Sequence, residues 1–245
     1  MSAGGPLAER QILERVLRFR GERGLPGTAF TTEEGSSQYL VTANHLTTGD
    51  PDENVSIGNF GFDERHLLLS RVDDPLEHGQ DVAVFVLEDE VASCAPLPLS
   101  SAGLMLSHDI LIAGFPAGLE QTWINDGAAD SRNMGGTPGR IPTERFPMLK
   151  RGIVGWMGSL SGQHVFLLDV LANFGFSGGP VVFRERETSQ IRVAGIVSST
   201  FSQTNSVRGI AEREYAGISV AAFTDTAVRA IAKHQAGEAG PRALR

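Results

Sequence analysis

The chain has 245 residues, of which 41% are hydrophobic and 20% are charged, and its formal net charge is −8. An acidic chain without a basic stripe argues against nucleic-acid binding, and no apolar run approaches the roughly 18 residues of a membrane span. The single cysteine, Cys94, excludes an intrachain disulfide, so we expect a soluble globular protein of the reducing cytoplasm.

The N-terminal stretch is predicted to form one amphipathic helix. Between residues 8 and 20, apolar side chains recur among charges at near-helical spacing. The stretch also lacks the continuous apolar core of a signal peptide, which agrees with a cytoplasmic location. We assign residues 1–24 to an N-terminal helical extension.

The rest of the chain is predicted to consist mainly of short strands. Runs such as TAFTT, SQYLVTA and DVAVFVL alternate with turn-forming clusters, and 29 glycines and 12 prolines favour many short elements. Two series of about six runs, joined by SSAGLMLS, indicate two stacked antiparallel barrels. We place the first barrel at 25–100, the second barrel with a C-terminal helix at 101–235, and a flexible tail at 236–245.

One Gly- and Pro-rich stretch, residues 124–149, interrupts the second series. It is too long for an ordinary hairpin, so it is either a functional lid or a disordered insertion.

The stretch NFGFSGGPVVF, residues 173–183, places Ser177 between glycines and before an apolar run. A serine hydroxyl becomes a nucleophile only beside a histidine base that a carboxylate orients, with backbone N–H donors for the oxyanion. Glycine before the serine adopts the backbone angles that turn these donors inward. Gly175 and Ser177 are therefore placed to supply them.

Two sets of partners for Ser177 follow from the sequence. GFSGG fits the nucleophile elbow of α/β-hydrolases, whose partners would be Asp225 and His234. That elbow requires a helix after the serine, whereas PVVF is a strand signal. Upstream, YLVTANHL ends an apolar strand on His45, and GQDVAVFVL opens one on Asp81. These two residues lie in the first series of strands, so a cleft between the barrels would bring them to Ser177.

The blocks around these residues resemble the signatures of trypsin-like serine peptidases. YLVTANHL, DVAVFVL and GFSGGPVV are similar to the histidine, aspartate and serine blocks of that family. ILIAGFPAGLEQTW, KRGIVGWMGSL and FLLDVLANFGFSGGPVV resemble blocks of its bacterial high-temperature-requirement (Deg) branch, in the same order. The resemblance covers residues 27 to about 223. It implies an all-β, chymotrypsin-like fold of two six-stranded barrels with an N-terminal and a C-terminal helix.

The resemblance also implies a serine endopeptidase that works through an acyl-enzyme. Ser177 matches the nucleophile, His45 the general base and Asp81 the orienting carboxylate, with Asp73 and Asp74 as nearby alternatives to Asp81. The other residues implied are Gly175, Phe176 and Ser177 for the oxyanion hole, and Leu171, Ala172, Asn173, Ser198, Ser199, Thr200 and Gly217 for substrate binding. A polypeptide substrate would pair as an extended strand with the segment around Ser198. No cofactor is implied, and the histidines show no metal-ligand spacing.

Three residues depart from the pattern of digestive trypsin-like enzymes. Phe176 replaces an aspartate that pairs with a freshly cut N-terminus, so we expect no zymogen. Its ring either packs against a nearby loop or biases the oxyanion hole toward an inactive arrangement. Leu171 replaces the acidic pocket floor, which predicts cleavage after small or medium apolar residues. Asn44, before His45, replaces the commoner alanine without an explanation in the sequence.

Two further functions stay open. A catalytically weak or inactive protease fold, kept as a peptide-binding or regulatory module, is suggested by Phe176 and the 124–149 insertion. An esterase would use the same three residues. No PDZ-like segment follows residue 235, so we expect regulation to come from the N-terminal helix, the insertion, a protein partner or a homo-oligomer.

Overall fold

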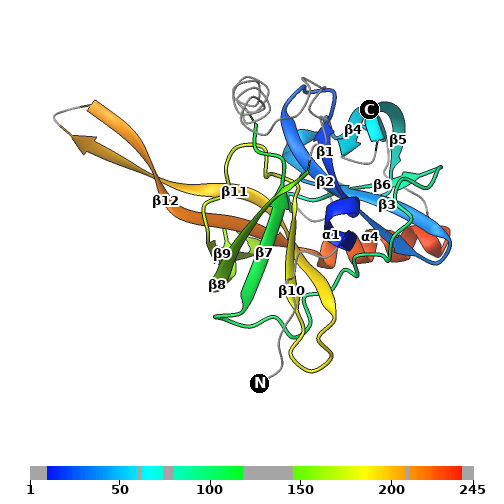
Figure 1. Cartoon of the computed structure of the whole chain (residues 1–245). Helices are drawn as coiled ribbons and strands as arrows, with labels where there is room; N and C mark the ends of the chain where they lie inside the picture. The colour runs from blue at the N-terminus through cyan, green and yellow to red at the C-terminus, as the bar shows by residue number, and fades with distance from the viewer. Residues whose placement is uncertain (1–9, 60–61, 74–79, 118–145, 208–209, 239–245) are drawn as a thin grey trace, which may run out of the picture.

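The computed structural model of the chain describes residues 10–59, 62–73, 80–117, 146–207 and 210–238. Within these residues the strands form two closed antiparallel barrels of six strands each, with short helices near both ends of the described chain (Figure 1). The predicted all-β, chymotrypsin-like fold class is confirmed.

The first barrel is closed in the order β1-β2-β3-β6-β5-β4. Its strands are β1 (Val16–Arg20), β2 (Pro26–Glu34), β3 (Ser37–Thr42), β4 (Asp52–Asn59), β5 (Phe62–Arg71) and β6 (Ala83–Leu87). The runs TAFTT, SQYLVTA and DVAVFVL lie in or next to β2, β3 and β6. A 3-10 turn, η1 (Asn44–Leu46), follows β3 directly.

The predicted helix over residues 8–20 is wrong in its second half. The helix α1 covers only Arg10–Arg15, and the chain continues as β1, which pairs with β2 and with β4. Val16, Leu17 and Phe19 are buried in this strand, and their spacing alone did not distinguish a strand from a helix. The strand forms because β1 closes the barrel, where the neighbouring strands β2 and β4 supply hydrogen-bond partners for the backbone of β1 on both sides. The predicted division into an extension, two barrels and a tail remains a proposal. The strand β1, which lies within the predicted extension, is part of the first barrel.

The second barrel is closed in the order β10-β11-β12-β9-β8-β7. Its strands are β7 (Asp109–Gly114), β8 (Met148–Leu160), β9 (Gln163–Asp169), β10 (Pro180–Arg184), β11 (Ile191–Val207) and β12 (Ile210–Phe223). The strands β11 and β12 pair with each other along their length and form a ribbon that extends away from the barrel (Figure 1).

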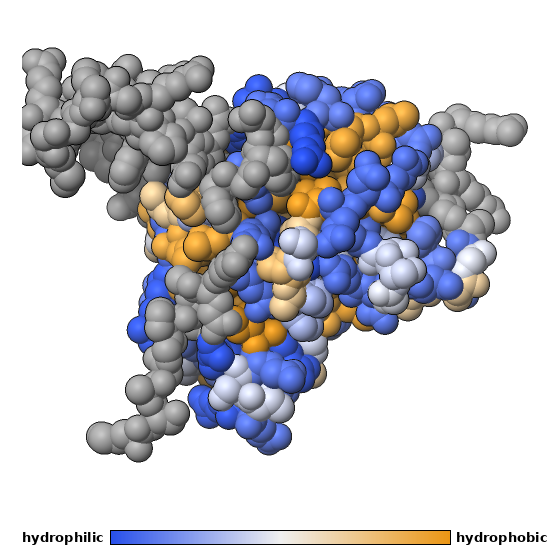
Figure 2. Space-filling model, turned by 45° about the vertical axis from the view of Figure 1, so that its right-hand side comes forward, coloured by the Kyte–Doolittle hydropathy of each residue, from blue (hydrophilic) through white to orange (hydrophobic). Residues whose placement is uncertain are grey.

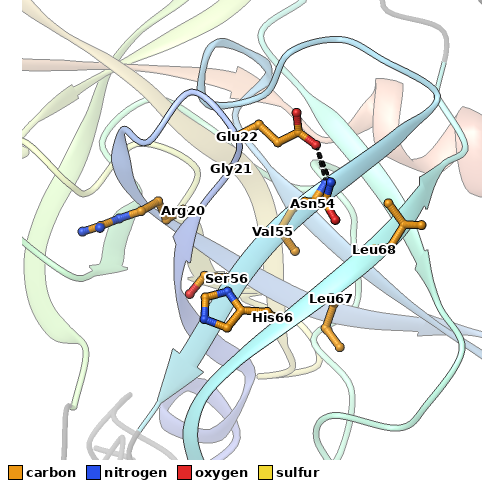
Figure 3. Close-up of a pocket in the computed structure, with 9 residues that line it drawn as sticks. All are labelled: Arg20, Gly21, Glu22, Asn54, Val55, Ser56, His66, Leu67 and Leu68. Atoms are coloured by element: carbon orange, nitrogen blue, oxygen red, sulfur yellow. Dashed lines mark hydrogen bonds between the residues drawn. The ribbon is translucent and has the colours of Figure 1, made fainter.

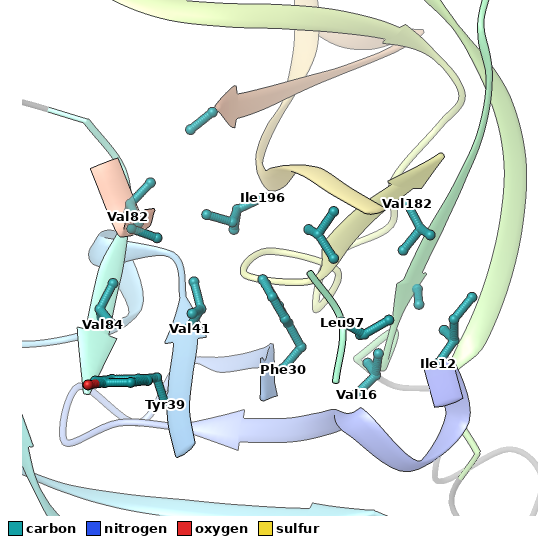
Figure 4. Packing of buried hydrophobic residues seen from close by; sticks show 14 of the residues in the cluster. Ile12, Val16, Phe30, Tyr39, Val41, Val82, Val84, Leu97, Val182 and Ile196 are labelled. Carbon is teal, nitrogen blue, oxygen red and sulfur yellow. The ribbon is translucent and has the colours of Figure 1, made fainter. Parts of the chain in front are cut away.

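A continuous apolar core joins the two barrels. It contains Phe30 and Val41 from the first barrel, Val182 and Ile196 from the second, and Leu97 from the segment between them (Figure 4). All five side chains are fully buried. Because close-packed cores resist relative movement, the barrels hold groups on their facing sides at fixed separations.

The C-terminal helix α4 (Asp225–Gln235) packs against the first barrel. Tyr39 Oη shares a hydrogen bond of 3.0 Å with His234 Nδ1 and accepts one of 2.6 Å from Gln235 Nε2. At the other end of the helix, Thr226 Oγ1 donates to Gln80 Oε1 at 2.6 Å. The helix therefore supports the segment that leads into β6.

The surface is mixed in character. On the face drawn in Figure 2, apolar residues reach the surface in separate patches between hydrophilic ones. None of the helices in the described part of the chain is long and apolar enough to cross a membrane.

Candidate active site

His45 and Asp81 form a close pair at the edge of the first barrel. His45 lies in the turn η1, and Asp81 lies two residues before β6. The ring Nδ1 of His45 is 2.7 Å from Asp81 Oδ2, and the main-chain N–H of His45 donates to Asp81 Oδ1 at 2.8 Å. The carboxylate therefore holds both the backbone and the ring of the histidine. The His45 side chain is 41% exposed, so its ring is accessible to a substrate.

Ser198, in β11 of the second barrel, binds the same carboxylate. Its Oγ donates to Asp81 Oδ2 at 2.6 Å. Burial acts to raise the pKa of Asp81, but the hydrogen bonds and charge of His45 and the bond from Ser198 outweigh it and lower the pKa. Asp81 is therefore held as an anion. The sequence analysis placed Ser198 on the substrate strand and missed this contact.

Ser177 also lies beside Ser198. Its Oγ donates a long hydrogen bond of 3.4 Å to the Ser198 carbonyl, and its residue is partly exposed. No hydrogen bond joins the described side chains of Ser177 and His45. Catalytic hydrogen bonds are often long or misaligned without substrate and tighten when it binds. Through Ser198, the structure brings all three residues of the predicted triad to one place between the barrels.

The loop that carries Ser177 requires glycine at two positions. Gly175 has a φ of +98°, and a Cβ there would lie 2.3 Å from the carbonyl oxygen of Phe115. Gly178 has a φ of +84°, and its Cβ would lie 2.0 Å from the carbonyl oxygen of Thr28. Any larger residue would clash and would be strained at these angles. The glycines on both sides of the nucleophile thus follow from this tight path.

Two carbonyl groups of this loop accept hydrogen bonds from main-chain N–H groups of the second barrel. The Phe174 carbonyl accepts from the Ala117 N–H at 2.7 Å, and the Phe176 carbonyl accepts from the Gly179 N–H at 2.9 Å. In a trans peptide the N–H points opposite to the carbonyl. The N–H groups of Gly175 and Ser177 share peptides with these carbonyls, and neither donates a hydrogen bond among the described residues. These two N–H groups are therefore available as donors to a ligand.

The ring of Phe176 packs into the core of the second barrel and not, as one of the two alternatives from the sequence had it, against a nearby loop. Its side chain is fully buried in the core of the second barrel, among Ile110, Ile112 and Val181. The ring also packs so closely on Gly114 that a Cβ there would lie 2.8 Å from it. Phe176 therefore fixes the loop by apolar packing.

Thr28, a buried residue of β2, connects this loop to the first barrel. Its N–H donates to the Ser177 carbonyl at 2.8 Å, and its Oγ1 donates to the Gly175 carbonyl at 2.7 Å. The same Oγ1 accepts from the Phe115 N–H at 3.0 Å. The sequence analysis missed this residue, since a threonine in a strand has no distinguishing local signal.

Asn44, unexplained in the sequence, binds a buried ion pair. Its Oδ1 accepts from Arg71 Nη2 at 2.6 Å, and Arg71 pairs with Asp73 at 2.7 Å. The side chains of the pair are 0% and 2% exposed. Arg71 also donates to Thr47 Oγ1 at 3.2 Å. The pair therefore secures the turn that carries His45. Asp73, one of the two alternative carboxylates, is engaged there, and the other, Asp74, lies outside the described residues.

The predicted substrate-binding residues surround the same loop. Thr200 Oγ1 donates to the Ala172 carbonyl at 2.9 Å, while Ser219 Oγ accepts from the Ala172 N–H at 2.8 Å and donates to the Val170 carbonyl at 2.6 Å. These bonds join the loop to β11 and β12. Ser219 was not among the predicted residues.

The remaining predicted residues differ in exposure. Leu171 is 40% exposed, Asn173 and Ser199 are exposed, and Gly217 has a φ of +74° with open space where a Cβ would stand. Two aromatic side chains close by in the sequence to these residues are also exposed, Phe174 at 66% and Phe201 at 41%. Most of the 124–149 insertion lies outside the described residues.

A separate pocket of about 390 Å³ lies on the first barrel, lined by residues 20–22, 54–56 and 66–68 (Figure 3). Glu22 Oε1 accepts from Asn54 Nδ2 at 2.8 Å at its rim. It contains none of the predicted site residues. Among the residues that the structure describes, no group of three or more His, Cys, Asp or Glu side chains is arranged to hold a metal ion.

Comparisons with known proteins agree with this architecture. The family model of the trypsin-like peptidase domain matches residues 27–189. No curated protein sequence matches the chain. The structure is similar to an inactive form of the Rv3671c protease of M. tuberculosis, with 16% identity, a TM-score of 0.56, and 91% of this chain and 89% of that one covered.

Two further structures share the fold. The HtrA-type protease AlgW with a tripeptide is 20% identical, with a TM-score of 0.58, and 93% of this chain is covered. The serine endoprotease from Yersinia pestis is 18% identical, with a TM-score of 0.56 and 91% coverage. The chain spans 62% and 64% of these two proteins.

Proposed function

The chain belongs to the family of trypsin-like peptidases and is a serine protease, and on this premise we propose that Ser177, His45 and Asp81 are its catalytic triad. The carboxylate of Asp81, which binds both the N–H and the ring of His45, is the observation that carries the proposal. With Nδ1 held by the carboxylate, the other ring nitrogen, Nε2, is the one that accepts a proton.

The proposed reaction has two stages. The Ser177 hydroxyl attacks the substrate carbonyl carbon while His45 Nε2 takes its proton, and the N–H groups of Gly175 and Ser177 bind the resulting oxyanion. His45 then returns the proton to the leaving amine, and the acyl-enzyme forms. In the second stage His45 takes a proton from water as its oxygen attacks the acyl carbon, and the proton then passes to the Ser177 oxygen as the ester bond breaks and the carboxylic acid product leaves.

The proposed substrate is a polypeptide bound as an extended strand along residues 198–200. The pairing of β11 with β10 ends at Ile196, and the main chain of Val197 still bonds to Gly178 and Gly179, so the main chain available for strand addition begins at Ser198. The tripeptide in the AlgW structure supports a peptide ligand for this fold. An uncharged Leu171 and the exposed Phe174 and Phe201 support a preference for small or medium apolar residues before the cut.

We also propose that the protein needs no zymogen cleavage. The buried Phe176 has no charge for a new N-terminus to bind, and apolar packing already holds its loop. A cytoplasmic location is proposed from Cys94, a free thiol. Regulation by a protein partner or by homo-oligomer formation is proposed for this chain as well.

The triad is tested with a fluorophosphonate probe, which labels an activated serine. We expect the wild type and Ser159→Ala, a change at an exposed serine of β8, to be labelled, and Ser177→Ala and His45→Ala to stay unlabelled. Equal labelling of Ser177→Ala would contradict the assignment. Cleavage profiling on a denatured proteome then reports the residue preference.

A second candidate function is a peptide-binding module with little catalysis, because Ser177 donates to Ser198 and not to His45 in this structure. It predicts peptide binding without labelling of the wild type by the probe. An esterase would cleave short acyl esters and no peptide of a library.

A further inference from the structure

Lys150, in β8, directs its side chain toward the loop that carries the nucleophile. It lies opposite the buried Ile112 of β7, and its own side chain is partly buried. Its Nζ donates to the Leu171 carbonyl at 2.8 Å and to Asn173 Oδ1. The same ammonium lies 5.2 Å from the ring centroid of Phe176. One cation thus contacts three residues of the segment 171–176.

The surroundings of this ammonium are unusual for a lysine. Its described partners are a carbonyl, a side-chain amide and an aromatic face, and none is a carboxylate. Partial burial removes some of the water around the ammonium and so lowers the pKa of Lys150. Arg151, the next residue, lies on the opposite side of the strand and pairs with Asp109 in an exposed ion pair. Of these two residues, Lys150 is the one whose described contacts are with residues 171–176.

These contacts bear on the two amides, of Gly175 and Ser177, that are proposed to bind the oxyanion. The Phe176 N–H donates to the Asn173 carbonyl at 3.1 Å, so Asn173 and Phe176 form a turn around Gly175. The bond of Ala117 to the Phe174 carbonyl anchors this turn from one side. The Lys150 ammonium anchors it from the other, at Asn173 and at the Phe176 ring.

We propose that Lys150 is a positioning residue for the oxyanion hole, whose ammonium holds residues 171–176 so that the N–H groups of Gly175 and Ser177 face the substrate carbonyl. This rests on the proposed function. In the digestive enzymes a freshly cut N-terminus pairs with an aspartate next to the nucleophile. Here the cation is a lysine of a barrel strand, and it contacts the ring of Phe176, which stands at the position of that aspartate.

The proposal predicts a defect in kcat more than in KM, because the oxyanion exists only after attack and not in the bound substrate. Removing one oxyanion donor costs about 10²–10³-fold in kcat, and loosening the loop should cost less, about 10- to 100-fold. Lys150→Met keeps the length of the stem and removes the charge. Lys150→Arg keeps a cation and should recover part of the lost kcat, although its planar group differs in geometry. Arg151→Met is the matched control.

The experiment measures kcat and KM of the four proteins on one peptide substrate, with thermal unfolding as the test of folding. Hydrogen exchange of the peptides that cover residues 171–177 gives a readout independent of activity. We expect Lys150→Met to lose kcat with KM within about twofold of the control and to exchange faster in this segment only.

Unchanged kcat in a folded Lys150→Met, or a loss confined to KM, would overturn the proposal. If Lys150→Met does not fold, the test uses Lys150→Arg. If residues 171–177 of Lys150→Arg exchange faster while its kcat equals that of Arg151→Met, a loosened loop does not reduce catalysis, and the role in positioning is contradicted. If the wild type neither cleaves nor reacts with the fluorophosphonate probe, the proposed function fails. The role of Lys150 as an anchor is then decided by exchange alone, and unchanged exchange in Lys150→Met would refute it.

Discussion

The main-chain N–H of Thr28 donates a hydrogen bond of 2.8 Å to the carbonyl oxygen of Ser177. Thr28 lies in the barrel that carries His45 and Asp81, and Ser177 lies in the other. With the Oγ1 bond from Thr28 to Gly175, this contact sets the nucleophile loop against the first barrel. The alignment of a triad split over two barrels therefore depends on a residue outside the triad.

Thr28→Val should reduce both stability and catalysis. The change leaves the Gly175 carbonyl and the Phe115 N–H without a buried partner, which costs about 1–3 kcal/mol for each. Because these bonds position the oxyanion amides, kcat should also fall. Thr32→Val is the matched control, since Thr32 is a buried threonine of the same strand that donates to the Leu97 carbonyl. It should lower the free energy of unfolding and leave kcat unchanged; equal kcat in both variants would contradict the prediction.

Ser198→Ala should weaken the support of Asp81. The variant removes the hydroxyl that donates to Asp81 Oδ2 at 2.6 Å, so the pKa of Asp81 should rise. We expect kcat to fall by about tenfold, the effect of losing a bond of about 1.5 kcal/mol to a charged group. Ser199→Ala, at the exposed neighbouring serine, should change kcat less. The measurement is steady-state kinetics of both variants on one peptide.

The stability that Asp81 contributes should depend on pH in one direction. Its pKa in the folded protein lies below the ordinary value, so the folded state favours the anion. This contribution is complete above the pKa of the unfolded chain, about 3.9, and is lost as the pH falls through the folded pKa. Urea unfolding of the wild type and Asp81→Asn, compared between about pH 5 and pH 3, should give a difference that becomes smaller below about pH 4. A difference that grew on acidification would have the wrong sign.

Arg71→Met and Arg151→Met should differ strongly in stability. Arg71 is buried, and its loss leaves Asp73 without its cation, which costs about 3–5 kcal/mol. Arg151 pairs with Asp109 at the surface, with side chains 71% and 59% exposed, and its loss should cost at most about 1 kcal/mol. Chemical denaturation of the two variants checks this. Similar costs would show that the buried pair is not what secures the turn of His45.

Several features of the site could be predicted from the sequence because they are local. The path of the loop at Gly175 and Gly178 requires glycine within a few residues of Ser177, and GFSGGP displays that requirement directly. The strand after Ser177 was likewise predicted, since Pro180 and the β-branched residues exclude the helix of an elbow. These are consequences of backbone angles and short-range propensity.

Other features were not accessible in this way. Arg10–Arg15 and Val16–Arg20 share one apolar pattern, and only the presence of β2 and β4 beside the second half made it a strand. From the sequence, the ring of Phe176 could either pack against other residues or bias the oxyanion hole toward an inactive arrangement. Its place in the core of the second barrel is known only from the structure. Lys150 gave no signal, because a lysine in a strand is normally solvated.

The sequence by itself therefore determined the strand-rich fold class and the type of chemistry, through alternating apolar runs and a glycine-flanked serine. Only the tertiary structure decided which distant groups meet, such as Asp81 and Ser198, which are 117 residues apart in the chain. The physical reason is that backbone propensity acts over a few residues, whereas these contacts form only when both barrels close and share one core.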